Sequence, residues 1–118
     1  MARALEIPIE EFGKLALQSE KDIPMNAQCA VFAESEVISL LHQKTDKKDI
    51  AKAVNDAVAS RITSMAKKVG YEKDIALIGG VSNNVGFVES LKRGLESEII
   101  VPENAEYVGA IGAAMSVS

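Results

Sequence analysis

The sequence is poor in several features that define whole classes of protein. It contains one cysteine and no tryptophan, and aromatic residues make up 4% of its 118 residues. The single cysteine, Cys29, cannot form an internal disulfide, which agrees with a reducing compartment. The formal net charge is −4, and the lysines are scattered among acidic residues, so no broad attraction to nucleic acid is expected. Nucleic acid is therefore not among the predicted partners.

Long hydrophobic runs are also missing. The longest apolar stretches, such as the one ending at Val101, are far shorter than the roughly 20 residues that a membrane-spanning helix needs. The first five residues do not combine a basic segment with an apolar core, so no secretory signal is expected. These observations predict a cytoplasmic protein without a membrane partner. The remaining composition, 47% hydrophobic and 25% charged, is typical of one folded domain.

Apolar spacing predicts three segments in the first 70 residues. Residues 9–17 form a short amphipathic helix, with Pro8 suited to its first turn. Residues 29–32 are compact and apolar, and we expect a short buried segment that leads into a helix. A long helix follows, with Thr45 or Asp46 as its N-cap and Gly70 at its end. Its expected buried stripe has helical spacing and consists of Ile50, Val54, Val58, Ile62, Met65 and Val69.

The remaining chain alternates strands and helices. Residues 75–78 are predicted as a buried strand, residues 87–95 as a helix and residues 99–101 as a second strand. Residues 108–115 are rich in alanine and glycine and predict a closely packed terminal helix. This alternation favours an α/β fold with parallel strands and crossover helices. Because two strands make a small sheet, we expect upstream chain or another copy to complete it.

A glycine pair after the first strand is the sharpest local feature, in the sequence IGGVSNN at positions 78–84. Glycines there would let a nucleotide approach the backbone, and the next helix would offer N–H groups to an anion. Alternatively, the pair makes only a tight turn, with Ser82 or Asn83 capping the helix. The motif is neither a P-loop nor a GxGxxG fingerprint. A second small-residue cluster, at positions 109–114, could face a flat ligand, although tight helix packing is more common.

Other polar residues carry weaker signals. Glu34 and Glu36 could form a carboxylate pair for acid–base chemistry or metal binding, but alternate acids before an apolar run more often face solvent or cap a helix. His42 follows an apolar stretch beside Gln43, where a solvated helix end is the favoured interpretation. The same bland interpretation applies to Cys29 taken alone, as a buried small hydrophobe. No catalytic residue is assigned.

Three stretches taken together carry a family resemblance. They are CAVFAESEVISLL from Cys29, GGVSNN from Gly79 and YVGAIGAA from Tyr107. The pairing of the last two resembles the actin, Hsp70 and sugar-kinase superfamily. All three resemble the activators of 2-hydroxyacyl-CoA dehydratases and the ATPase subunits of benzoyl-CoA reductases, and the likeness covers nearly the whole chain. Asn83 departs from the pattern, because this family often has a different polar or basic residue there.

The resemblance implies a fold and a set of sites. Residues 1–118 would be the C-terminal portion of the second actin-like (ribonuclease H-like) ATPase domain, with the first domain and the phosphate-binding strands upstream of Met1. The adenosine of ATP or ADP, bound with Mg, would lie beside Gly79, Gly80, Val81, Ser82, Asn84 and Gly109. Cys29 would be the second of two cysteines that each subunit of a homodimer gives to a four-iron four-sulfur cluster. With the first cysteine also upstream, two copies of this chain would offer two thiolates where four are normally needed, so we expect no stable cluster here.

The resemblance also implies an activity. ATP hydrolysis would drive low-potential electrons, supplied by reduced ferredoxin or flavodoxin, through the cluster to a dehydratase or reductase component. Two alternatives stay open: a small-molecule kinase of the same superfamily, and a non-catalytic binding or assembly module. Because missing strands would leave apolar surface exposed, the isolated chain is expected to self-associate.

Overall fold

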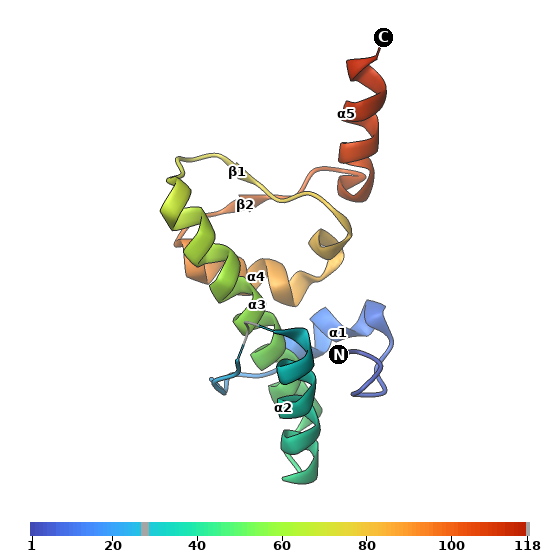
Figure 1. The fold of residues 1–118 in the computed structure, drawn as a ribbon, viewed down its shortest axis with the longest axis vertical. Helices are drawn as coiled ribbons and strands as arrows, with labels where there is room; N and C mark the ends of the chain where they lie inside the picture. The colour runs from blue at the N-terminus through green and yellow to red at the C-terminus, as the bar shows by residue number, and fades with distance from the viewer. Residues whose placement is uncertain (27–28, 118) are drawn as a thin grey trace.

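The computed structural model describes residues 1–26 and 29–117 as an elongated molecule of 54 × 28 × 25 Å. Its helices are α1 (Ile9–Ala16), α2 (Ala30–His42), α3 (Lys47–Val69), α4 (Val85–Leu95) and α5 (Val108–Ser116). The strands are β1 (Ile75–Ala76) and β2 (Ile99–Ile100), and the short 3-10 turns are η1 (Gly80–Asn83) and η2 (Ala105–Tyr107). No helix within these ranges is both long and apolar enough to cross a membrane. Figure 1 shows α2 and α5 at opposite ends of the molecule.

Helix α3 is the central element. Asp46 is its N-cap, accepting a hydrogen bond from the Lys48 amide, and Gly70 follows it at a φ of 83°, as predicted. Its N-terminal half packs against α1 and α2 in a first hydrophobic cluster built on Leu5, Phe12, Ala16, Val37, Ile50 and Ala51. Its C-terminal half packs against α4 and β2 in a second cluster built on Ala59, Phe87, Leu91, Leu95 and Ile99.

The two strands are parallel, as predicted, with Ile75 opposite Ile99 and Ala76 opposite Ile100. Helix α4 is the crossover between them and buries the predicted apolar face. The first strand is shorter and less buried than predicted, because it pairs on one side only within the described residues and Ile78 is 49% exposed.

Three further expectations were wrong. Cys29 is followed immediately by a helix, and Val31 and Phe32 in its first turn are exposed. A short apolar run does not distinguish a buried segment from a helix, and this run continues into good helix formers. In α3 the predicted stripe is buried only near its start: Val58, Met65 and Val69 are exposed, while the buried positions further along are small or polar.

The terminal helix forms but is not closely packed. None of its residues is buried, and in Figure 1 it projects away from the other helices. Its composition of small and apolar residues suits close packing, but within the described chain no element covers it. The tertiary context, not the helix propensity, accounts for this difference.

Candidate functional site

The glycine turn between β1 and α4 is held at both ends by backbone hydrogen bonds. The Gly79 amide donates to the carbonyl of Ala105 at 2.9 Å, and the Asn84 amide donates to the carbonyl of Val81 at 2.9 Å. Gly79 has a φ of 98°, which side chains rarely allow. The structure therefore brings this turn beside the η2 turn that leads into α5, although the two segments are separated in sequence.

Open space surrounds the glycines predicted to border a nucleotide. A Cβ atom built on Gly79, Gly80 or Gly109 would meet nothing within 4 Å. Val81, between the glycines and Ser82, is 57% exposed. Internal packing therefore does not explain these glycines, and a ligand could approach their backbone.

The polar residues of the turn have structural partners. The Ser82 hydroxyl donates to the carbonyl of Gly79 at 2.6 Å, so it closes the turn and does not cap α4. The cap is Asn84, whose Oδ1 accepts from the Phe87 amide at 3.0 Å. The predicted cap at Ser82 or Asn83 was therefore misplaced by one or two residues. Asn84 is occupied as a cap, so it shapes the site by holding the turn against α4.

The other predicted residues lie elsewhere. Cys29 is a free, half-buried thiol at the N-cap position of α2 and lines a cavity of about 280 Å³ with Val54, Ala57 and Val58. His42 is exposed at the end of α2, as expected. Glu34 is exposed, and the carboxylate of Glu36 accepts from the Asn26 amide at 2.9 Å, so the two acids do not act as a pair.

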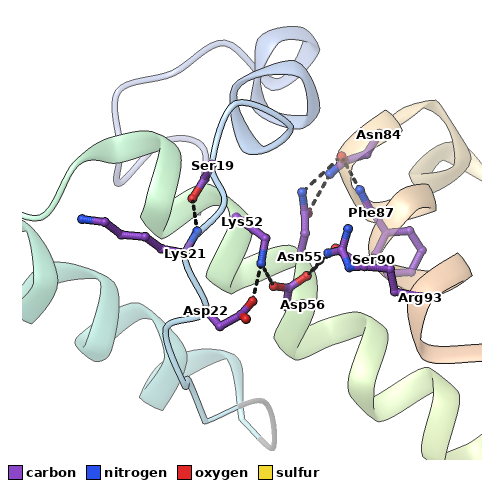
Figure 2. A network of polar contacts seen from close by, with 10 residues as sticks. All are labelled: Ser19, Lys21, Asp22, Lys52, Asn55, Asp56, Asn84, Phe87, Ser90 and Arg93. Carbon is purple, nitrogen blue, oxygen red and sulfur yellow. Dashed lines mark hydrogen bonds and ion pairs between the residues drawn. The ribbon is translucent and has the colours of Figure 1, made fainter.

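A network of polar side chains that the sequence analysis missed links these regions through α3 (Figure 2). Lys52 contacts Asp22 and Asp56, each at 2.7 Å, and Asp56 accepts from the Ser90 hydroxyl at 2.6 Å. Arg93 of α4 also contacts Asp56 at 2.7 Å. Positions 49, 52, 55 and 56 share one helical face by their spacing, and this was the available signal.

Burial and pairing oppose each other in this network. Burial would raise the pKa of Asp56, but hydrogen bonds from Lys52 and Ser90 outweigh it and hold the pKa below its usual value. Burial would lower the pKa of Lys52, but its hydrogen bonds to Asp22 and Asp56 hold it above the usual value. Both groups are therefore stabilised in their charged forms. A hydrogen bond from Ser19, together with the charge of Lys21, lowers the pKa of the buried Asp49.

Cofactor chemistry can be tested against these residues. The described ranges contain no group of three or more His, Cys, Asp or Glu side chains that could hold a metal ion. Cys29 suits one ligand of an iron–sulfur cluster, because a helix N-terminus favours a thiolate, but four thiolates are normally required. A complete cluster site does not fit the described part of this chain.

Comparisons with known proteins agree with the geometry. The chain is 43% identical over 115 residues to the (R)-2-hydroxyglutaryl-CoA dehydratase activating ATPase of Acidaminococcus fermentans, covering 98% of this chain and 44% of that protein. It is 30% identical over 121 residues to one of the subunits of the benzoyl-CoA reductase of Thauera aromatica, covering 98% and 43%. The chain thus spans less than half the length of the curated relatives it matches.

A solved structure gives the same result. The activator of the 2-hydroxyisocaproyl-CoA dehydratase from Clostridium difficile, with bound ADPNP, superposes with a TM-score of 0.92 at 36% identity, covering 98% of this chain and 43% of that one. Residues 1–117 match the family described as the BadF/BadG/BcrA/BcrD ATPases. With its parallel strands and glycine turn arranged as in these proteins, the chain belongs to the BadF/BadG/BcrA/BcrD ATPase family.

Proposed function

We propose that this chain is the C-terminal portion of the second actin-like domain of an ATPase and forms the adenosine side of its nucleotide site. The observation that carries the proposal is the open space at Gly79 and Gly80, beside the turn that leads into α5. Gly80, Val81, Ser82 and Asn84 would complete this side, with Gly109 opposite. The first domain and the phosphate-binding strands would lie in a further part of the protein, and Mg would accompany the nucleotide.

The nucleotide site is tested by adding bulk where the fold has room for it. Gly80 does not have a positive φ and an added Cβ meets nothing, so Gly80→Val should fold normally in the complete protein. We expect its dissociation constant for a fluorescent ADP analogue to rise at least tenfold. Ser64→Val, which adds comparable bulk on the exposed surface of α3, is the control. Equal affinity in Gly80→Val and the unmodified protein would sink the proposal.

For the complete protein we propose the activator role that its relatives carry: ATP hydrolysis coupled to electron transfer to a 2-hydroxyacyl-CoA dehydratase or benzoyl-CoA reductase component. The protein would be a cytoplasmic homodimer, and reduced ferredoxin or flavodoxin would supply the electrons. A nucleotide can shift the protein between arrangements only by binding one of them better, so ATP and ADP would need to favour different interdomain arrangements. Acceptor reduction that proceeds equally well without ATP would contradict this coupling.

Cys29 is proposed as one thiolate ligand of a four-iron four-sulfur cluster shared between the two subunits. When bound, such a cluster would accept and release single electrons. The exposed first turn of α2 beside Cys29 is compatible with a neighbouring subunit at this end of the molecule. Iron and acid-labile sulfide, measured anaerobically in the complete protein, should be lost in Cys29→Ala. An unmodified protein that holds no cluster after reconstitution would instead favour the small-molecule kinase or the assembly module.

A further inference from the structure

Asn55 is a buried amide in the middle of α3 whose side chain faces the end of the glycine turn. It is 4% exposed and exchanges two hydrogen bonds with Asn84 (Figure 2). Asn84 Nδ2 donates to Asn55 Oδ1 at 3.0 Å, and Asn55 Nδ2 donates to Asn84 Oδ1 at 3.4 Å. A buried amide without such partners would cost free energy, so each side chain stabilises the orientation of the other.

The exchange decides which way the Asn84 amide faces. Asn84 Oδ1 accepts from Asn55 and also from the Phe87 amide, which begins the hydrogen bonding of α4. If the amide turned over, its NH₂ group would face the Phe87 N–H and the cap would be lost. Asn55 therefore selects the orientation in which Asn84 can cap the helix.

Close backbone packing leaves this pair no alternative arrangement. A Cβ built on Gly86 would lie 2.7 Å from Asn55 Nδ2 and 2.7 Å from the carbonyl oxygen of Gly13. A Cβ built on Gly13 would collide with Asn84 Oδ1. Helices α1 and α4 thus enclose the amide pair with backbone atoms. This precise fit is more than a helix cap alone requires, because caps ordinarily function at exposed helix ends.

We propose that Asn55 is a positioning residue for nucleotide binding: it acts through Asn84 to hold the turn from Gly79 to Asn84 and the first turn of α4 in the geometry that receives an adenine nucleotide. The inference rests on the proposed function. The turn is fixed at its start by the Gly79–Ala105 hydrogen bond and at its end by Asn84. Asn55 is the link that connects this end to the long helix that runs through both hydrophobic clusters.

Asn55→Asp provides the sharpest test in the complete protein. The carboxylate keeps an acceptor for Asn84 Nδ2 but places a second acceptor against Asn84 Oδ1. We expect the dissociation constant for a fluorescent ADP analogue to rise about tenfold at pH 7.5, relative to the unmodified protein at the same pH. Burial raises the pKa of a carboxyl group, and the protonated acid regains a donor, so the ratio should return toward one as the pH falls to about 5.5.

Two variants separate positioning from general stability. Asn55→Ala should weaken binding without any recovery at low pH, and it serves if Asn55→Asp does not fold. Ser90→Ala removes a nearby hydrogen bond on α4 but leaves the amide pair intact, so its affinity should match the unmodified protein. A folded Asn55→Asp or Asn55→Ala variant with unchanged affinity would overturn the positioning role and leave the proposed nucleotide site standing. An unmodified protein that does not bind the analogue would overturn both.

Discussion

Lys52 and Asp22 are 30 positions apart in the chain, yet Lys52 Nζ lies 2.7 Å from Asp22 Oδ1. The Lys52 side chain is 11% exposed, whereas that of Asp22 is 93% exposed. The contact attaches the segment that precedes Cys29 to the middle of α3. Because Lys52 also contacts Asp56, which is bonded to α4, one ammonium group connects the regions of the two candidate sites.

Removing the Lys52 charge should destabilise the fold. In Lys52→Met, Asp56 would keep Ser90 and Arg93 but lose its most buried partner, and the segment at Asp22 would lose its attachment. We expect the free energy of unfolding to fall by about 2 kcal/mol, less than for a fully buried ion pair. Urea denaturation measures it. Lys14→Met is the control, because Lys14 is exposed and 3.9 Å from Glu11, and its effect should stay within about 0.5 kcal/mol.

Stability should fall in acid because of Asp56. Its pKa in the folded chain lies below the usual 3.8, so its charged form contributes stability above about pH 4 that is lost as the pH falls further. In Asp56→Asn this acid-dependent loss should be smaller. Urea midpoints measured between pH 6 and pH 3 test the difference, and identical slopes in both proteins would contradict it.

At high pH the sign is reversed for Lys52. Its pKa in the folded chain is above the usual 10.5, so its stabilising contribution is complete below that value and is lost as the pH rises through the folded pKa. Thermal unfolding between pH 9 and pH 12 should therefore show a steeper loss in the unmodified chain than in Lys52→Met. A steeper loss in the variant would show that another group controls the alkaline transition.

Gly94 and Thr63 form the closest part of the contact between α4 and α3. A Cβ on Gly94 would collide with the Thr63 hydroxyl and lie 3.3 Å from Thr63 Cβ. Replacing glycine by alanine inside a helix ordinarily gains up to about 1 kcal/mol, but overpacking costs about 1–3 kcal/mol, so Gly94→Ala should destabilise the chain by about 1 kcal/mol.

A double-mutant cycle tests that explanation. Among the described residues, Thr63 Oγ1 is a buried polar atom without a hydrogen-bond partner, so Thr63→Ala removes both an obstruction and an unsatisfied group. The Gly94→Ala penalty should shrink by at least half in the Thr63→Ala background. Additive effects would show that the two positions do not collide.

The exposed terminal helix should promote self-association of the chain. Ile111 is 51% exposed and Met115 is 71% exposed, on a helix with no buried residue. Contiguous apolar surface of this kind is uncommon on monomers. Light scattering should show association that increases with concentration and weakens in the double variant Ile111→Gln, Met115→Gln. Val69→Gln, at an isolated exposed position of α3, should change little, and a monomer at every concentration would contradict the prediction.

Much of the architecture could be predicted from local patterns. The capping signal at Asp46, the closing Gly70 and the apolar spacing from Phe87 to Leu95 identified α3 and α4 because caps and helical periodicity depend on neighbouring residues only. Parallel pairing of the two strands followed from the intervening helix. The candidate turn was found because a glycine pair after a strand is itself a local pattern.

Other features depended on contacts between distant residues. The sequence by itself determined where the helices lie and that Gly79 and Gly80 form a turn. Only the tertiary structure decided that α5 is uncovered, that half of the α3 stripe faces outward, and that Asn84 and not Ser82 caps α4. It also decided that Asn55 and Lys52 are buried, because a polar side chain can be buried only where partners such as Asn84 and Asp56 are brought to it by folding.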